Sequence, residues 1–314
     1  MKRKNLLIKK KNRRKKKKVN KRKVLSYLFI LFYIFSFNNI FSLEFNNRIK
    51  IGKNVIIRGQ TFPILIRKNK KIIPRIFVND RKYSVKNFNE EWYVVFVNYD
   101  LLSSEETACI KIKENNTTIY KNDFTIIDPE FEYERIYLPR RYNKDQKKYF
   151  NQLYPSLSYY EENKINTTIR NYYYSRYFQG KFSYPLKGRI TSPFGKVRAY
   201  NNGGYNSYHT GIDIGGNKIG TPIYAPNNGI VILSEIFYKR GKTLIIAHGI
   251  NVKSLYYHLD NFNVSKGDIV NKGDIIGYVG TTGFSTGPHL HWEVRIDNNI
   301  VNPNFFVKND IEEF

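Results

Sequence analysis

The 314-residue sequence has little cysteine and little histidine. Its one cysteine, Cys109, excludes a disulfide within the chain, and its distance from the N-terminus argues against a lipid-modified N-terminal cysteine. No histidine precedes His209, so none in that part of the chain can activate the thiol. In "ETACIKIK" the isoleucines alternate with lysines, which predicts a half-buried strand with Cys109 on the lysine face as a structural residue.

Acidic residues are absent from the N-terminus, where the first carboxylate is Glu44. Residues 2–23 hold fifteen Lys or Arg, and an apolar stretch follows from Val24 to Phe37. A basic block before such a stretch is typical of an export signal. The A-x-A cleavage pattern is missing and Ser42 is the only small residue near a suitable position, so residues 1–43 are either a signal peptide or a retained anchor in the inner membrane.

The formal net charge of +27 raises the alternative of a basic nucleic-acid tail beside a buried strand. Beyond the N-terminal run, however, 38 basic residues stand against 26 acidic ones, with no dense basic stripe. We therefore expect no nucleic-acid partner.

The rest of the chain divides into three segments of different composition and a short tail. Residues 44–128 are a series of short β-like runs separated by Asn, Gly, Asp and Lys, which predicts a small antiparallel β-sandwich as an accessory domain. Residues 129–182 predict a connector with two helical stretches, one on either side of Pro155. Residues 183–307 are rich in glycine and β-branched residues, and 308–314 form a tail. The expected fold class is mainly β, with a C-terminal antiparallel sheet preceded by the sandwich and the partly helical connector.

A six-residue tandem, "SKGDIV" then "NKGDII", occupies Ser265 to Ile276. Lys-Gly-Asp before an apolar pair is typical of a tight turn that leads into a strand. Asp268 and Asp274 are therefore predicted to form turns and not to bind metal.

All five histidines fall within the last block: His209, His248, His258, His289 and His291. Generic core histidines would also occur in the longer N-terminal part. Such clustering is typical of a metal site or an acid/base site.

The spacing of these residues predicts shared strand faces. In "YHTGIDIGG" the glycines disfavour a helix, and an extended backbone puts His209 and Asp213 on one face. In "HLHWEV" the alternation puts His289, His291 and Glu293 on one face. Two such strands side by side would bring two or three imidazoles and a carboxylate together, which suits Zn²⁺ with an open fourth position. Glu293 could then orient one of the imidazoles.

Residues from about 184 to 307 contain, in this order, the stretches "GRITSPFG", "HTGIDI", "GTPIYAPNNGIV", "LIIAHG", "LYYHL", "VSKGDIVNKGDIIGYVGTTGFSTGPHLHWEV" and "VNP". In these stretches and in their order the segment resembles the lysostaphin-type (LytM-type) zinc metalloendopeptidases, which cut peptidoglycan peptides. The segment covers about two fifths of the chain. The β-rich segment and the connector are loosely similar to the accessory region of exported family members.

The resemblance implies a sheet-floored groove and assigns roles to the clustered residues. It implies that His209, Asp213 and His291 bind Zn²⁺, and that His258 and His289 are the catalytic histidines. No HExxH glutamate is present, so a histidine must act as the base; which of the two does so stays open. His248 is expected to be structural or to support the site.

Two departures from the family pattern accompany this resemblance: Asn251 or Val252 stands where a turn glycine is usual, and Tyr257 replaces a small residue before His258. The first would alter a turn and the second a groove wall, and neither removes a metal ligand or a catalytic histidine. Some family members that have lost ligands act as regulatory modules for other wall hydrolases. The complete residue set predicts an active peptidoglycan endopeptidase, exported to the periplasm or cell envelope, and leaves open which peptide bond it cuts.

Overall fold

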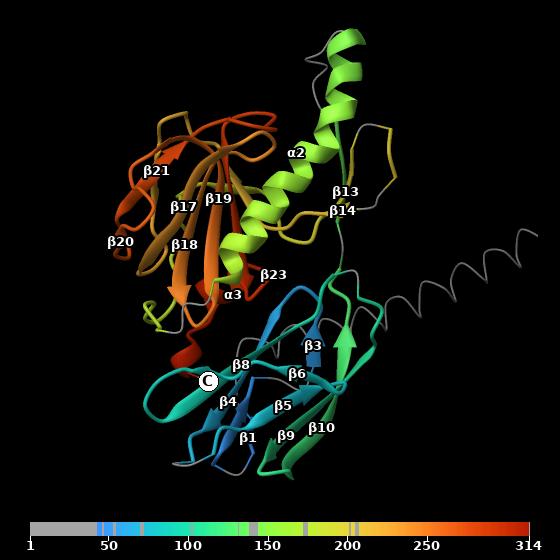
Figure 1. The fold of residues 1–314 in the computed structure, drawn as a ribbon, viewed down its shortest axis with the longest axis vertical. Coiled ribbons are helices and arrows are strands. Elements are labelled where there is room, and N and C mark those ends of the chain that lie inside the picture. Colours follow the sequence, from blue (N-terminus) through green and yellow to red (C-terminus); the bar gives the residue numbers. More distant parts are fainter. Residues whose placement is uncertain are drawn as a thin grey trace, which may run out of the picture. The chain divides into compact units, whose positions relative to one another are not determined.

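The structure is a computed structural model that describes residues 43–45, 47–52, 55–69, 72–101, 103–130, 132–137, 144–171, 175–200, 202–204 and 207–313. The basic N-terminal run and the apolar segment that follows it lie outside these residues. Among the described helices, none is both long and apolar enough to cross a membrane. The structure is mainly β, as predicted (Figure 1).

The first part of the described chain consists of two five-stranded sheets. Their orders are β1-β2-β4-β8-β7 and β3-β10-β9-β5-β6. Branched and aromatic side chains from both sheets share one core, which includes Ile64, Val95, Ile110 and Phe124. Cys109 lies in β9 on the half-buried face with Lys111, as its alternation predicted. The strands are β1 Leu43–Phe45, β2 Ile49–Ile51, β3 Val55–Ile57, β4 Thr61–Arg67, β5 Arg75–Val78, β6 Arg81–Tyr83, β7 Lys86–Asn87, β8 Trp92–Asn98, β9 Thr107–Glu114 and β10 Thr117–Ile127.

One helix, α2 (Lys144–Arg170), follows, and it corrects the prediction of two helices separated by Pro155. A proline inside a helix costs about 3 kcal/mol, because it removes a backbone hydrogen bond. The C-terminal half of α2 offsets this cost by burying a stripe at i, i+4 spacing that contains Ile165 and Ile169. Each buried isoleucine contributes about 1.5–3 kcal/mol. Tertiary packing therefore outweighs the local preference.

The second part is built on a ten-stranded sheet whose main path is β12-β15-β22-β19-β18-β17-β20. Off this path, β21 pairs with β16 and β19, and β23 pairs with β22. A small sheet, β11-β13-β14, begins with a parallel pair. The strands are β11 Tyr133–Ile136, β12 Arg189–Ser192, β13 Val197–Tyr200, β14 Ser207–Tyr208, β15 Ile212–Gly215, β16 Pro222–Tyr224, β17 Gly229–Phe237, β18 Gly241–Gly249, β19 Val252–Phe262, β20 Ile269–Val270, β21 Ile275–Val279, β22 His289–Ile296 and β23 Asn299–Val301.

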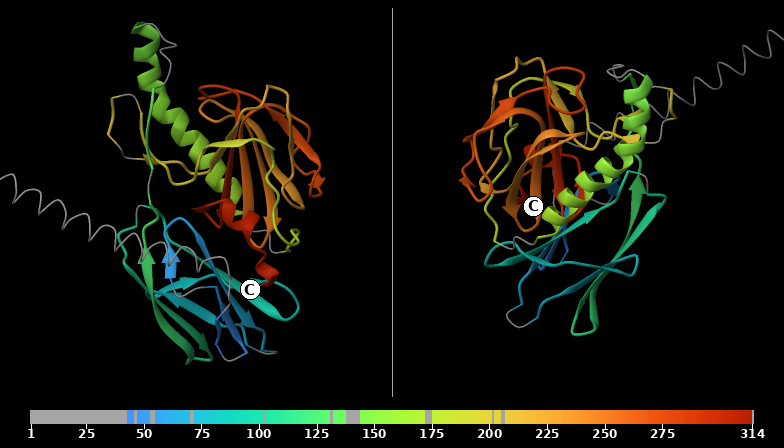
Figure 2. Two further views of the ribbon diagram at one scale, coloured as in Figure 1. Left: turned by 180° about the vertical axis from the view of Figure 1, so that it is seen from behind. Right: turned by 45° about the horizontal axis from the view of Figure 1, so that its top comes forward.

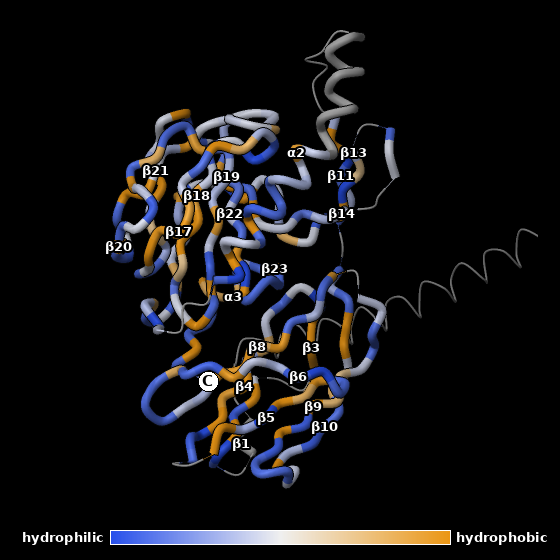
Figure 3. The backbone as a smooth tube through the Cα atoms, viewed as in Figure 1, coloured by the Kyte–Doolittle hydropathy of each residue, from blue (hydrophilic) through white to orange (hydrophobic). Residues whose placement is uncertain are grey.

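Strand β18 is buried on both faces. Leu244 and Ile246 enter the large core on one face, while Ile245 and Ala247 pack with Ile165 of α2 on the other. A run that is apolar at every position suits a strand covered on both sides. Figure 3 shows hydrophobic stretches along β17 and β18, and both views of Figure 2 show α2 beside this sheet.

The Lys-Gly-Asp tandem forms two matching turns, which confirms that part of the prediction. Asp268 accepts a hydrogen bond from the Ser265 backbone at 2.8 Å, and Asp274 accepts one from the Asn271 backbone at 2.7 Å. After the last strand the chain ends with α3 (Asn304–Lys308) and a 3₁₀ turn, η2 (Ile311–Glu313). Ile311 is buried in the large core.

Candidate metal centre

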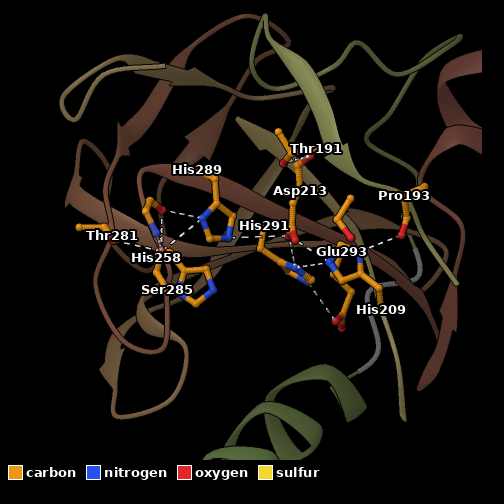
Figure 4. A network of polar contacts seen from close by, with 12 residues as sticks. Thr191, Pro193, His209, Asp213, His258, Thr281, Ser285, His289, His291 and Glu293 are labelled. Atoms are coloured by element: carbon orange, nitrogen blue, oxygen red, sulfur yellow. Dashed lines mark hydrogen bonds and ion pairs between the residues drawn. The ribbon is translucent and has the colours of Figure 1, made fainter. Parts of the chain in front are cut away.

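His209, Asp213 and His291 converge on one point. Asp213 in β15 pairs directly with His291 in β22, and His209 lies four residues before Asp213. Asp213 Oδ1 is 3.0 Å from His209 Nε2 and 2.9 Å from His291 Nδ1, and the two ring nitrogens are 2.9 Å apart (Figure 4). Three potential ligand atoms thus form a small triangle.

Gly211 lets the segment that carries His209 come this close to β22. A Cβ atom at this position would collide with the Trp292 carbonyl oxygen and lie 2.8 Å from His291 Nε2. Only glycine leaves that space empty. The HxGxD spacing therefore serves both the donor atoms and the contact between the two segments.

The ring nitrogens that face the triangle present lone pairs. His209 Nδ1 lies 2.9 Å from the Pro193 carbonyl oxygen, which can only accept, so Nδ1 carries the proton and Nε2 does not. His291 Nε2 is buried and lies 3.8 Å from a Glu293 oxygen, which favours the proton on that nitrogen. Two lone pairs and a carboxylate oxygen about 3 Å apart repel one another unless a proton or a cation lies between them. The donor set therefore fits a metal ion, and two nitrogens with one oxygen match a tetrahedral zinc site with one open position.

Asp213 is held as a carboxylate. Burial alone would raise its pKa, but the interactions with the His209 and His291 imidazoles outweigh burial and hold the pKa well below the usual value. Its second oxygen, Oδ2, accepts a hydrogen bond from Arg198 Nη2 at 2.9 Å. Arg198 also donates to Glu134 Oε2 at 3.3 Å, so the small sheet supports the site. An arginine between two apolar neighbours, Val197 and Ala199, was the only sequence signal for this contact.

His258 and His289 form a second pair beside the triangle. Their ring centroids are 4.9 Å apart, and His289 Nε2 is 3.8 Å from Asp213 Oδ1. Each Nδ1 lies 2.8 Å from a carbonyl oxygen, that of Thr282 for His258 and that of Gly287 for His289. These carbonyls fix the proton on Nδ1 and leave both Nε2 atoms as lone-pair donors. Figure 4 shows this pair on one side of Asp213 and His209 on the other.

His258 has an unusual backbone. Its φ is +65°, in the left-handed region that non-glycine residues rarely occupy. It lies where β19 has one residue more than β18 opposite it, between Tyr256 and Leu259. Such a bulge redirects a side chain, and bulges are common beside active sites. Burial, together with the nearby His289 and His291, lowers the pKa of His258 to about 3, so the imidazole is neutral.

His248 serves a different purpose. Its Nδ1 is 2.8 Å from the Asn228 carbonyl oxygen and its Nε2 is 2.7 Å from Ser254 Oγ, while its ring packs edge-on against Phe182. Burial lowers its pKa to about 4. Both nitrogens are occupied by protein groups, so His248 has no donor atom left for a metal.

Residues 207–303 match the peptidase family M23. The chain carries an M23 peptidase domain. All five clustered site residues lie within the matched range of this M23 domain: His209, Asp213, His258, His289 and His291.

Relatives of the M23 domain are longer proteins. The DD-carboxypeptidase/endopeptidase Mpg of Neisseria meningitidis serogroup B is 42% identical over 115 residues, which is 37% of this chain and 26% of that protein. The peptidoglycan DD-endopeptidase ShyB of Vibrio cholerae is 39% identical over 113 residues, 36% of this chain and 26% of that protein. The chain thus spans about a quarter of the length of these two relatives.

A solved structure shares the fold over a longer range. A Pseudomonas aeruginosa protein whose crystal structure carries the peptidase M23 designation superposes with a TM-score of 0.56 at 22% identity. The match covers 82% of this chain and 95% of that one. The shared architecture therefore extends beyond the M23 domain.

Proposed function

We propose that this protein is a zinc-dependent endopeptidase that hydrolyses peptide cross-links or stem peptides of bacterial peptidoglycan. The observation that carries the proposal is the triangle of His209 Nε2, His291 Nδ1 and Asp213 Oδ1, with two further histidines beside it. The M23 domain and the peptidoglycan endopeptidases among its relatives support the same reaction class.

In this proposal His209, Asp213 and His291 hold the zinc ion. When bound, zinc supplies a Lewis acid that polarises the scissile carbonyl and acidifies water. Asp213 contributes the negative charge of the ligand set, which its lowered pKa preserves. The Pro193 carbonyl fixes the His209 ring through Nδ1, so Nε2 keeps its direction.

His258 and His289 move protons and stabilise charge. The carbonyl-bound Nδ1 of each ring leaves Nε2 able to take a proton from water and return it to the leaving amine. Once protonated, an Nε2 can donate to the oxyanion of the tetrahedral intermediate. The pair divides these two tasks between rings 4.9 Å apart.

The N-terminal sequence supports export to the periplasm or cell envelope, where peptidoglycan lies. Residues 1–43 would act as a signal peptide or as a membrane anchor, and the basic run would stay in the cytoplasm. In this division residues 44–128 are an accessory domain, 129–182 a connector, 183–307 the catalytic domain and 308–314 a tail.

The rival function is a regulatory module that binds the wall without cutting it. Peptidoglycan zymography of the whole chain separates the two functions. We expect clearing by the wild type, loss of clearing with chelator or with His209→Ala, and retention with Cys109→Ala, which lies far from the site in sequence and in a different sheet. Absence of clearing by folded, zinc-loaded wild type, or undiminished clearing by His209→Ala, would contradict the peptidase.

A further inference from the structure

Tyr257 is part of the metal centre's support and not of a groove wall. Its side chain is 4% exposed, and it pairs directly with His291 across β19 and β22. The tyrosine and imidazole rings stack with centroids 5.0 Å apart and planes 10° from parallel. Among the described residues the Tyr257 hydroxyl has no hydrogen-bond partner. The contribution of Tyr257 is therefore the face of its ring.

Arg240 connects this ring to helix α2. Its guanidinium lies 5.4 Å from the centre of the Tyr257 ring, within range of a cation–π interaction. Arg240 Nη2 donates to Glu162 at 2.6 Å and Nη1 to Glu161 at 3.4 Å. Glu161 is 2% exposed and also accepts the Lys239 backbone N–H at 2.6 Å. Buried charges of this kind stay in place, because leaving one unpaired is costly.

The same arginine fixes the backbone of His258. The Arg240 carbonyl oxygen accepts the His258 N–H at 2.9 Å. This bond falls at the bulge where His258 has its positive φ. A conformation that is unfavourable by itself persists only when its surroundings hold it. Arg240 therefore contacts both the ring that stacks on His291 and the backbone that aims His258.

A second series of contacts connects the same helix to His291. Asn166 of α2 accepts a hydrogen bond from Arg295 Nη1 at 3.1 Å, and Glu162 lies 3.7 Å from the same nitrogen. Arg295 pairs with Glu293, and Glu293 lies 3.8 Å from His291 Nε2. The first series of contacts thus ends on the face of the His291 imidazole, and the second ends on its outer nitrogen, Nε2.

We propose that helix α2 positions the metal-facing nitrogen of His291 through Arg240 and Tyr257 on the ring face and through Arg295 and Glu293 on the ring edge. This inference rests on the proposed function, because it assigns His291 to the metal. Tyr257, Arg240 and Glu162 are positioning residues. The helix is then an integral part of the site rather than a spacer before it.

Zinc affinity of the whole chain tests this role, measured by competition with a chromophoric chelator and by the absorption spectrum of the Co²⁺-loaded protein. Tyr257→Ala is expected to weaken zinc binding by about 10- to 100-fold, as loss of a ligand's supporting contact does. Tyr257→Phe keeps the ring and loses only the unpartnered hydroxyl, so it is expected to retain wild-type affinity and spectrum. Equal affinity for folded Tyr257→Ala and wild type would overturn the proposal.

Glu162→Gln tests the helix itself without a core cavity, because the Glu162 side chain is 43% exposed. Its matched control is Glu235→Gln, which removes the exposed Lys164–Glu235 ion pair between α2 and β17. We expect weaker zinc binding and an altered Co²⁺ spectrum for Glu162→Gln, to a smaller extent than for Tyr257→Ala, and no change for Glu235→Gln. Identical behaviour of the two glutamine variants would overturn the role of the helix.

These outcomes are distinct from a failure of the proposed function. A wild type that binds zinc but releases no peptidoglycan fragments would refute the peptidase function. The positioning role of helix α2 would still be tested by the zinc affinities of the variants. A wild type that binds no zinc would refute both proposals at their common step. Zinc binding that is insensitive to Tyr257 and Glu162 in an active enzyme would refute the positioning role alone.

Discussion

Arg198 and Asp213 form a largely buried ion pair behind the triangle of potential ligands. Arg198 Nη2 lies 2.9 Å from Asp213 Oδ2, while Asp213 Oδ1 faces the two histidines. The two side chains are 12% and 13% exposed. The guanidinium thus fixes which carboxylate oxygen is presented to the metal position. Because Glu134 of β11 also binds Arg198, a residue from before helix α2 takes part in this arrangement.

Arg198→Gln is expected to weaken zinc binding about 10- to 100-fold, because an outer partner that orients a ligand is lost. Arg135→Gln is the matched control, since Arg135 lies on β11 and donates to the Gly203 carbonyl oxygen instead of Asp213. Competition titration with a chelator measures both. Unchanged affinity in folded Arg198→Gln would show that the carboxylate orients itself without the ion pair.

Gly211→Ala is expected to separate the segment that carries His209 from β22. The added Cβ would collide with a backbone oxygen of Trp292, which cannot rotate away as a side chain could. Overpacking of this kind costs about 1–3 kcal/mol in unfolding free energy. Because the collision also involves His291 Nε2, zinc affinity should fall together with stability.

Gly204→Ala provides the control for that variant. A Cβ at Gly204 meets no atom of the described residues within 4 Å, so stability and zinc affinity should stay at wild-type values. Urea unfolding and chelator competition distinguish the two glycines. If both alanine variants behaved alike, the close approach at Gly211 would not be needed.

The strand that carries His289 and His291 was predictable because apolar residues alternate without interruption with histidine and glutamate along it. Leu290, Trp292 and Val294 are fully buried, as the alternation required. The Lys-Gly-Asp turns were predictable for a similar reason, since each depends on a side chain that bonds its own turn. Local rules fix both features, so one sequence suffices.

Other features depend on contacts between distant parts of the chain. The helix continues past Pro155 because Ile165 and Ile169 find a partner surface on β17–β19. The orientation of the His258 side chain depends on a bulge in β19 opposite β18, and no local sequence pattern predicts this bulge. Arg198 lies in no motif and gains its role from pairing with residues 15 and 64 positions away, Asp213 and Glu134. The periodicity of apolar residues in the sequence does not identify such distant partners.

Zinc is expected to raise the thermal midpoint of the wild type, because a ligand that binds only the folded state stabilises that state. At a free zinc concentration a thousandfold above the dissociation constant the gain is about 4 kcal/mol. Asp213→Asn removes the charge from the ligand set and should abolish the shift, and chelator should reverse it in the wild type. Differential scanning calorimetry with and without zinc measures this. A zinc-induced shift of equal size in Asp213→Asn would place the ion elsewhere.

His248 is expected to make the protein acid-sensitive between about pH 6.5 and pH 4. Burial lowers its folded-state pKa to about 4, below its ordinary value of 6.5, so the unfolded chain binds the proton more readily. Its contribution to stability is therefore complete above pH 6.5 and is lost as the pH falls towards 4, amounting to about 3 kcal/mol. His248→Gln loses packing against Phe182 at every pH but has no proton to bind, so its unfolding free energy should fall less steeply over this interval. His258 titrates in both proteins, so the difference between their urea-unfolding curves at each pH isolates His248. Parallel pH profiles for wild type and His248→Gln would mean that His248 binds its proton as readily in the folded protein as in the unfolded chain.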